Sequence, residues 1–132
     1  MIAEAPVLDE RALRDPLSVY LVVNGPLGMI AGKIASQAFQ AAQRLLDAET
    51  QDPRLAGLLA QWRREGTCTI TRVAQTPAVF ERLMREVPGR PMIDEGLTEV
   101  TPGSITCYAT YPIRRSQEPT MIRHKKVRLM AA

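Results

Sequence analysis

Hydrophobic and polar positions follow different periods along the chain, and each period predicts an element. Residues 17–23 form a nearly continuous apolar and β-branched run, which is typical of a central strand buried on both faces. After a break rich in glycine and proline, apolar residues recur at helical spacing over residues 31–48, which predicts a long amphipathic helix. The fold is therefore expected to begin with a strand, a loop and a helix.

The remaining pattern predicts two more helices and three more strands. Asp52–Pro53 and Thr76–Pro77 each combine a capping residue with a proline at the first helical position. The helices that they open should end at Gly66 and before Pro88. β-Branched or alternating runs predict strands at residues 67–73, 91–93 and 105–111. Elements in this order predict a small α/β domain whose sheet lies between layers of helices.

Length and composition limit the number of domains and the surroundings of the protein. The chain has 132 residues, of which 45% are hydrophobic, enough for one core but too little for two. We expect one domain over residues 1–132, with an N-terminal extension at 1–16 and a basic C-terminal tail at 113–132. The first 16 residues lack the basic start and apolar run of a signal peptide. No other run approaches the ~18 apolar residues of a membrane span. A soluble, cytoplasmic protein without membrane contacts is therefore expected.

The positive charge is concentrated near the C-terminus. The formal net charge is +3, and six basic residues but only one acidic residue follow Pro112. The rest of the chain therefore carries a net charge of −2. Such a cluster attracts the phosphates of nucleic acids, although a charged terminus is also typical of a solvated chain end.

Cysteine and histidine are too few for several kinds of site. Cys68 and Cys107 lie far apart in strand-like segments, so we interpret them as small buried hydrophobic residues and not as a disulfide or a metal pair. The chain contains one histidine, His124, in the basic tail. A cluster of cysteine and histidine ligands or a Ser-His-Asp triad cannot be built from one chain with this composition.

The predicted helix at residues 31–48 carries the first functional signal. Lys33 falls in its first turn, where the positive end of the helix dipole disfavours a lysine. An ammonium beside helix amides suits a phosphate, a carboxylate or a developing oxyanion, and a solvated lysine is the alternative. A P-loop is excluded because Leu27 stands where its first glycine belongs and Ile34 provides no hydroxyl for magnesium.

Two segments resemble the signature segments of a known family. Residues 32–42 read Gly-Lys-Ile-Ala-Ser-Gln-Ala-Phe-Gln-Ala-Ala, and residues 94–104 read Asp-Glu-Gly-Leu-Thr-Glu-Val-Thr-Pro-Gly-Ser. In order and spacing, residues 18–130 resemble the second peptidyl-tRNA hydrolase family. The resemblance implies a three-layer α/β/α sandwich with a small mixed four-stranded sheet, usually a homodimer. It implies hydrolysis of the ester between a peptide and the 3′ end of tRNA, with peptidyl-tRNA as partner and no cofactor.

The resemblance assigns roles to individual residues. The catalytic positions of the family fall on Lys33, Asp94 and Thr98. Its substrate-binding positions fall on Gly32, Gln37, Gln40, Pro102, Gly103 and Ser104. Ester hydrolysis needs a positioned water, a proton acceptor and donors for the oxyanion. Asp94 could orient and deprotonate the water, Lys33 could stabilise the oxyanion, and Thr98 could hold water or ester. We expect the lysine and the aspartate to meet at a solvent-facing rim.

The chain departs from the family pattern near the lysine. Ala31 replaces another lysine and Gln40 replaces a histidine. Two alternatives therefore stand beside the hydrolase: a binding module for RNA or protein that has kept the fold, and a hydrolase of a different ester or amide. Without the resemblance, Asp94 and the residues after it would be interpreted as an ordinary turn, and both glutamines as solvated helix surface.

Overall fold

The computed structural model describes residues 10–95 and 100–130. The strands are β1 (Leu17–Asn24), β2 (Thr69–Ala74), β3 (Gly89–Ile93), β4 (Ile105–Thr110), β5 (Ile113–Arg114) and β6 (Val127–Leu129). The helices are α1 (Glu10–Arg14), α2 (Ala31–Asp47), α3 (Pro53–Arg64) and α4 (Pro77–Glu86), with 3-10 turns η1 (Gly25–Leu27), η2 (Ala48–Gln51) and η3 (Arg115–Gln117). The predicted order of elements between residues 17 and 111 is confirmed, whereas α1, β5 and β6 were not predicted.

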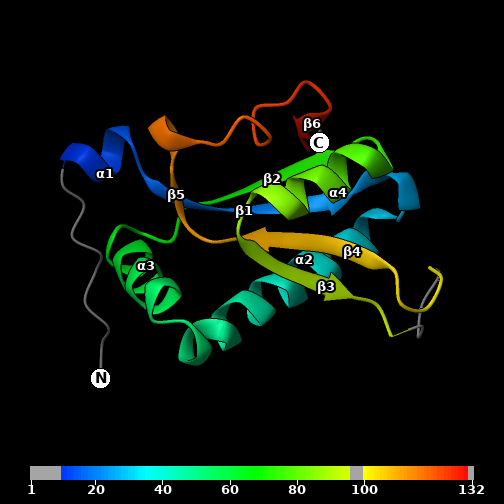
Figure 1. Ribbon diagram of the computed structural model, residues 1–132, viewed down its shortest axis with the longest axis horizontal. Coiled ribbons are helices and arrows are strands. Elements are labelled where there is room, and N and C mark those ends of the chain that lie inside the picture. The colour runs from blue at the N-terminus through cyan, green and yellow to red at the C-terminus, as the bar shows by residue number, and fades with distance from the viewer. Residues whose placement is uncertain (1–9, 96–99, 131–132) are drawn as a thin grey trace.

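A mixed sheet forms the centre of the molecule (Figure 1). Its strand order is β3-β4-β1-β2-β6, and β5 pairs with the first residues of β1. β1 and β2 are parallel, and the other pairs are antiparallel. The α/β class and the mixed sheet agree with the prediction, but the prediction of four strands is wrong because the sheet has six. Both additional strands come from the segment that was expected to be a tail.

Strand β1 is covered by helices on both of its faces. Val19, Leu21 and Val23 belong to one core cluster, together with residues of α2 and α3. Tyr20 and Val22 alternate with them and belong to a second cluster, together with residues of α4 and of the C-terminal segment. The continuous apolar run is explained by this double burial, since neither face of β1 meets solvent.

The C-terminal segment is part of the domain. Met121, Ile122 and Val127 are buried in the second core cluster, and β6 pairs with β2. The hydroxyl of Tyr20 donates a hydrogen bond to the Glu118 carboxylate, and burial raises the pKa of Tyr20. The basic residues of this segment are therefore held on the sheet and do not form a free chain end.

The caps predicted for two helices are confirmed. The Asp52 carboxylate accepts a hydrogen bond from the backbone N–H of Arg54 at 3.0 Å, and Pro53 begins α3. The Thr76 hydroxyl accepts a hydrogen bond from the backbone N–H of Val79 at 3.2 Å, at the start of α4. Each side chain satisfies a backbone donor that the first turn of a helix leaves unpaired.

The expectation that both cysteines are buried holds for Cys107 but not for Cys68, which is half-buried. Cys68 and Cys107 are both free thiols, and burial raises the pKa of Cys107 to about 12, so its thiol stays protonated. Within residues 10–95 and 100–130, no helix is long and apolar enough to cross a membrane.

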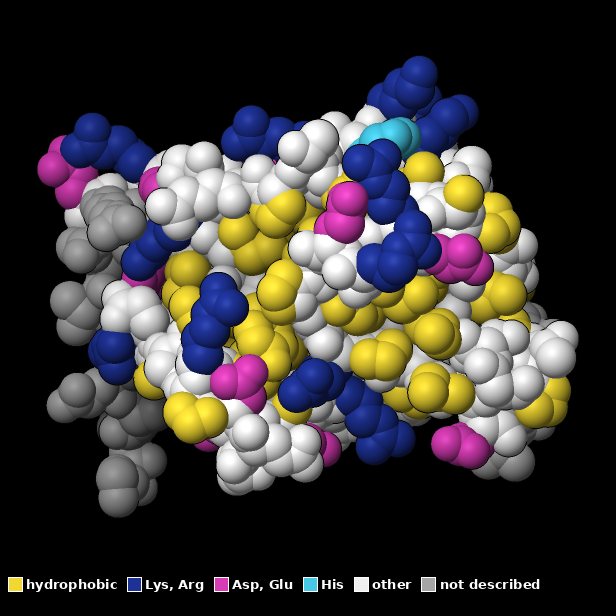
Figure 2. Space-filling model, in the orientation of Figure 1, with side chains coloured by type: hydrophobic (Ala, Val, Ile, Leu, Met, Phe, Trp, Pro, Cys, Tyr) yellow, Lys and Arg dark blue, Asp and Glu magenta, His cyan; other side chains and the backbone are white. Residues whose placement is uncertain are grey.

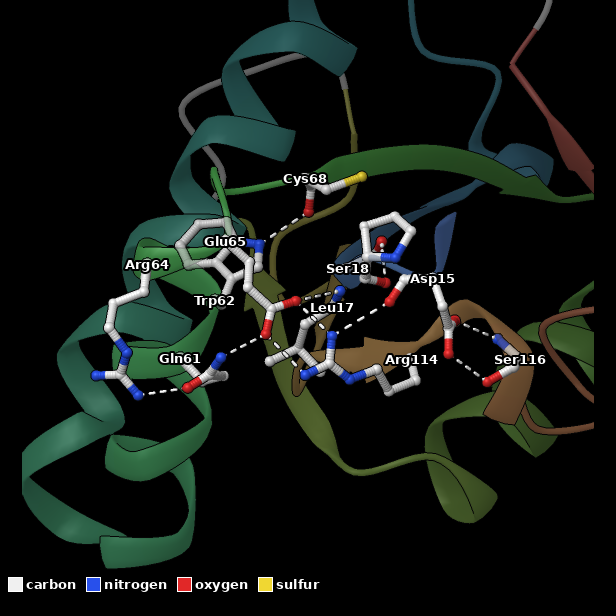
Figure 3. A network of polar contacts seen from close by, with 11 residues as sticks. Asp15, Leu17, Ser18, Gln61, Trp62, Arg64, Glu65, Cys68, Arg114 and Ser116 are labelled. Carbon is white, nitrogen blue, oxygen red and sulfur yellow. Dashed lines mark hydrogen bonds and ion pairs between the residues drawn. The ribbon is translucent and has the colours of Figure 1, made fainter. Parts of the chain in front are cut away.

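A buried ion pair joins α3 to the beginning of the sheet (Figure 3). Glu65 and Arg114 form a bidentate pair, with Nη2 of the arginine 2.7 Å from Oε2 of the glutamate. The carboxylate also accepts hydrogen bonds from the Gln61 side chain at 2.6 Å and from the backbone N–H of Leu17 at 3.3 Å. The side chains of the pair are 6% and 13% exposed. Through them α3, β1 and β5 are connected at one point.

This pair predicts a loss of stability in acid. The hydrogen bonds from Arg114 lower the pKa of Glu65 from 4.5 to about 2. Because the pKa is lower in the folded state, the stabilisation is complete above about pH 4.5 and is lost as the pH falls towards 2. Allowing for solvent screening, it amounts to roughly 1–3 kcal/mol. Urea unfolding at about pH 6 and pH 3 should show a larger drop in the free energy of unfolding for the wild type than for Glu65→Gln. Equal drops would contradict the assignment.

Candidate active site

Lys33 and Asp94 come together at one edge of the sheet. β1 and β3 point in the same direction, because each is antiparallel to β4, which lies between them. Their carboxyl ends therefore share an edge, the place where open α/β sheets bind ligands. Lys33 lies in the first turn of α2, which follows β1, and Asp94 directly follows β3. The Lys33 Nζ atom is 3.2 Å from Oδ1 of Asp94.

The pair is more enclosed than a solvent-facing rim. The two side chains are only 8% and 6% exposed, so the expectation of an exposed rim is wrong. The backbone explains this burial. The N–H of Asp94 donates to the carbonyl of Ser104 at 2.9 Å, and the N–H of Gly103 donates to the carbonyl of Asp94 at 2.8 Å. The two ends of the loop are thus fastened together and hold the carboxylate against α2.

The amino end of α2 adds positive character to the same place. Ile30 is the N-cap and has no side-chain acceptor, and residues 31–34 contain no Asp or Glu. The amides of the first turn and the Lys33 ammonium therefore act in the same direction, favouring a bound or developing negative charge. A Cβ atom placed on Gly32 would meet no other atom within 4 Å, so the first turn is open on that side.

Gln37 lies inside the protein, one turn after Lys33. The sequence pattern placed Gln37 on the solvated face of the helix, but it is 3% exposed. Its Oε1 accepts a hydrogen bond from the hydroxyl of Thr106, which also lies 3.3 Å from the carbonyl oxygen of Met92. Through Thr106, Gln37 therefore connects α2 to β4 and to the backbone of β3. Gln40, one turn further on, is half-buried.

Thr106 is a residue of this site that sequence reasoning missed. It is fully buried on β4, and a hydroxyl within a strand gives no signal of its own in the sequence. Two features together could have indicated it: a threonine at the second position of the apolar strand that begins directly after Ser104, and an amide at helical spacing from Lys33.

The other predicted site residues lie in the loop between β3 and β4. Pro102 and Gly103 form the expected turn, and the φ of Gly103 is +85°, a left-handed conformation that favours glycine. Ser104 is half-buried. Thr98 lies outside the described residues. The structure thus places Lys33, Asp94, Gly32, Gln37 and the Pro-Gly turn at one edge.

A pocket lies at the opposite edge of the sheet. It has a volume of about 450 Å³ and is lined by Leu17, Leu58, Tyr111 and further residues of α3 and the C-terminal segment. Since Leu17 is the first residue of β1, this pocket is far from the Lys33–Asp94 pair. Among the described residues, no three His, Cys, Asp or Glu side chains come together to hold a metal ion.

Comparison with known proteins gives the class and then the family. Residues 17–127 match the family described as Peptidyl-tRNA hydrolase PTH2. A peptidyl-tRNA hydrolase of Pyrobaculum aerophilum is 32% identical over 97 residues, which cover 70% of this chain and 81% of that protein. The protein is therefore a hydrolase by class. It belongs to the peptidyl-tRNA hydrolase PTH2 family, so the resemblance inferred from residues 32–42 and 94–104 is confirmed.

Proposed function

We propose that this protein hydrolyses the ester bond between a peptide and the 3′ end of tRNA in the cytoplasm, with Asp94 and Lys33 as its catalytic groups. The observation that carries the proposal is the 3.2 Å contact between these two buried side chains at the amino end of α2. Residues 61 positions apart in the chain are brought together where a carboxylate, an ammonium and helix amides can act on one substrate carbonyl.

In the proposed mechanism Asp94 acts as the general base for the attacking water. Its carboxylate orients a water molecule and accepts a proton as the water oxygen attacks the ester carbonyl. The carbon–oxygen bond to the tRNA ribose then breaks, and the proton passes from Asp94 to the departing 3′ oxygen. The products are a peptide carboxylic acid and a tRNA with a free hydroxyl, so one water is consumed and no cofactor takes part.

Lys33 supplies the complementary charge. The attacked carbonyl oxygen becomes negative in the transition state, and the Lys33 ammonium with the first amides of α2 would stabilise it. Burial strengthens this interaction because few water molecules screen it. The direct contact with Asp94 also fixes the position of the ammonium before substrate arrives.

The surrounding residues are proposed to bind the substrate. Gly32 leaves the first turn of α2 open, so the chain end of tRNA can approach closely there. Gln37 holds the helix in place through Thr106. Gln40, Pro102, Gly103 and Ser104 remain proposed substrate contacts, and Thr98 remains a proposed catalytic residue.

One assay tests the function directly. Purified protein is incubated with a peptidyl-tRNA, and the release of free tRNA is followed over time. We expect multiple turnovers in the absence of added metal or cofactor. A parallel reaction with a simple activated ester of the same peptide tests the alternative of a different substrate, because a preference for that ester would contradict the tRNA assignment. No turnover on either substrate would contradict the proposed activity.

We also propose a homodimer, for which the outer face of α2 offers an apolar surface. Phe39 is 66% exposed, and the exposed Ala31 and Ala35 precede it at helical spacing on the same side of the helix. Ile30, the N-cap of α2, is also 66% exposed. Exposed apolar surface of this kind is typical of an interface. Light scattering should give twice the chain mass, and Phe39→Ser should shift the protein towards the monomer.

Leu129 provides the matched control for this prediction. It is also a large exposed hydrophobic residue, 64% exposed, but it lies on β6. Leu129→Ser should leave the mass unchanged. A monomer mass for the wild type over the micromolar range would refute the dimer, and a Phe39→Ser dimer as tight as the wild type would refute this surface.

A further inference from the structure

The fold places the first and the last basic residues of the C-terminal segment at opposite edges of the sheet. Arg114 pairs with the first residue of β1 and binds Glu65, and Arg115 follows it at the same edge, 3.9 Å from Glu118. Val127, in contrast, pairs with Ala74, the last residue of β2. Arg123 lies near Arg115, because both guanidinium groups contact Glu118. The basic residues of the chain end therefore do not form one surface, and the later group consists of Lys125, Lys126 and Arg128.

This later group lies at the same edge as the candidate catalytic pair. The backbone N–H of Gln75, just after β2, donates to the carbonyl of Lys126 at 2.8 Å. β2 is parallel to β1 with Asn24 opposite Ala74, so the end of β2 and the end of β1 lie side by side. Lys126 is thus fixed at the carboxyl edge of the sheet, the edge to which Lys33 also belongs.

The side chains of this group point into solvent from a rigid support. We define the basic edge surface as Lys125, Lys126 and Arg128, all of which are exposed. Figure 2 shows dark blue side chains gathered around the single cyan histidine at the upper edge of the molecule. The support is firm because Met121 and Ile122 are buried directly before it.

The lysines of this surface are not neutralised by the acidic residue of the same segment. Glu118 contacts Arg123 instead, with Nε of the arginine 3.3 Å from Oε2. Within the described part of the chain, Lys125 and Lys126 form no ion pair with an acidic side chain. Two lysines held close together in this way favour a partner with several negative charges.

The separation of this surface from the catalytic pair indicates the size of that partner. β3 and β6 are four strands apart in the sheet order, which at ~4.8 Å per strand corresponds to roughly 19 Å. The surface therefore cannot touch the ester that Lys33 and Asp94 are proposed to cleave. A polyanion that begins at the ester and extends along the edge could contact both.

We propose that the basic edge surface binds backbone phosphates of the tRNA arm whose 3′ end lies at Lys33 and Asp94. This inference rests on the proposed function and adds a second contact region to it. Phosphate contacts bind and position a nucleic acid without reading its sequence. The surface should therefore affect substrate binding and leave the chemical step unchanged.

The test uses two double variants with the same change in charge. Lys125→Gln/Lys126→Gln removes two cations from the basic edge surface. Arg63→Gln/Arg64→Gln removes two exposed cations from the end of α3, which lies at the opposite edge, next to Leu17. The dissociation constant for deacylated tRNA is measured for both variants and the wild type between about 50 and 300 mM salt.

The expected result is a difference between the two variants. Each lost phosphate contact lowers the magnitude of the slope of log K against the logarithm of the salt concentration by about 0.9. The slope of the lysine variant should therefore be smaller by nearly 2. At low salt this variant should bind tRNA about tenfold more weakly than the wild type. The arginine variant should keep the slope of the wild type. In hydrolysis, the lysine variant should raise KM with an unchanged kcat.

Failure of this inference can be told apart from failure of the proposed function. Equal slopes in the two variants, with hydrolysis intact, would refute phosphate binding by the basic edge surface. The proposed active site would not be affected by that result. A specific loss of slope in the lysine variant, in a protein that hydrolyses no peptidyl-tRNA, would support the surface and overturn the catalytic assignment. A changed kcat in the lysine variant would overturn the assignment of the surface to binding alone.

Discussion

Asp94→Asn should lower kcat for peptidyl-tRNA hydrolysis by about 100-fold or more. The amide keeps the shape of the carboxylate but cannot accept the proton of the attacking water, and losing such a group typically removes two orders of magnitude or more. Lys33→Ala should have an effect of similar size, because it removes the charge that stabilises the oxyanion. Single-turnover release of tRNA from saturating enzyme measures the chemical step.

Stability must be measured alongside activity in these variants. Both side chains are more than 90% buried, and removing one member of a buried pair can cost about 3–5 kcal/mol because the other charge remains. Lys33→Met/Asp94→Leu removes both charges and should recover much of this stability while staying inactive. Thermal unfolding of the two single variants and the double variant separates a folding defect from lost chemistry.

Two results would contradict the proposed mechanism. Wild-type kcat in Lys33→Ala would exclude the lysine from the reaction even though it contacts Asp94. Activity that recovers in the double variant together with its stability would show that the pair only supports the fold.

Glu65→Ala should destabilise the protein by about 3–5 kcal/mol, the second large effect that we expect. The variant leaves the Arg114 guanidinium largely buried without its bidentate partner, and the backbone N–H of Leu17 loses its acceptor. The effect arises at the junction of α3, β1 and β5, so local relaxation cannot relieve it easily. Urea unfolding at pH 7 measures the change in the free energy of unfolding.

The exposed pair of Arg82 and Glu86 is the matched control. Its atoms are 3.2 Å apart, but its side chains are 52% and 47% exposed, so Glu86→Ala should cost about 0.5 kcal/mol or less. Glu65→Leu/Arg114→Leu should be more stable than Glu65→Ala, because no charge remains buried. A loss below 1 kcal/mol in Glu65→Ala would show that the buried pair contributes no more than a surface pair.

Local sequence patterns predicted the elements whose signals are strong. The helix at residues 31–48 and the strand at residues 17–23 have long, regular apolar patterns, and both agree with the structure to within one residue at each end. The caps at Asp52 and Thr76 were equally clear, since a capping residue followed by proline is typical of the start of a helix. The meeting of Lys33 and Asp94 was expected from the resemblance, and the directions of β1 and β3 in the structure explain it.

Features that depend on distant contacts could not be predicted in this way. β6 has three residues in a basic segment, and its pairing depends on β2, more than 50 residues earlier. Gln37 looked like a surface amide because periodicity cannot reveal a buried acceptor for Thr106. The burial of Lys33 and Asp94 depends on hydrogen bonds between the two ends of the loop at residues 94–104, which a local pattern does not contain.

The strand order also determines which strand edges are exposed, and therefore where copies of this protein could aggregate. The outermost strands are β3 and β6, and an open strand edge invites pairing with another chain. Pro91 interrupts the donors of β3, and β6 is only three residues long and includes the charged Arg128. Continuous sheets across molecules are therefore disfavoured at both edges. The proposed dimer uses the outer face of α2 and not a strand edge, so it would close after two copies without growth into fibrils.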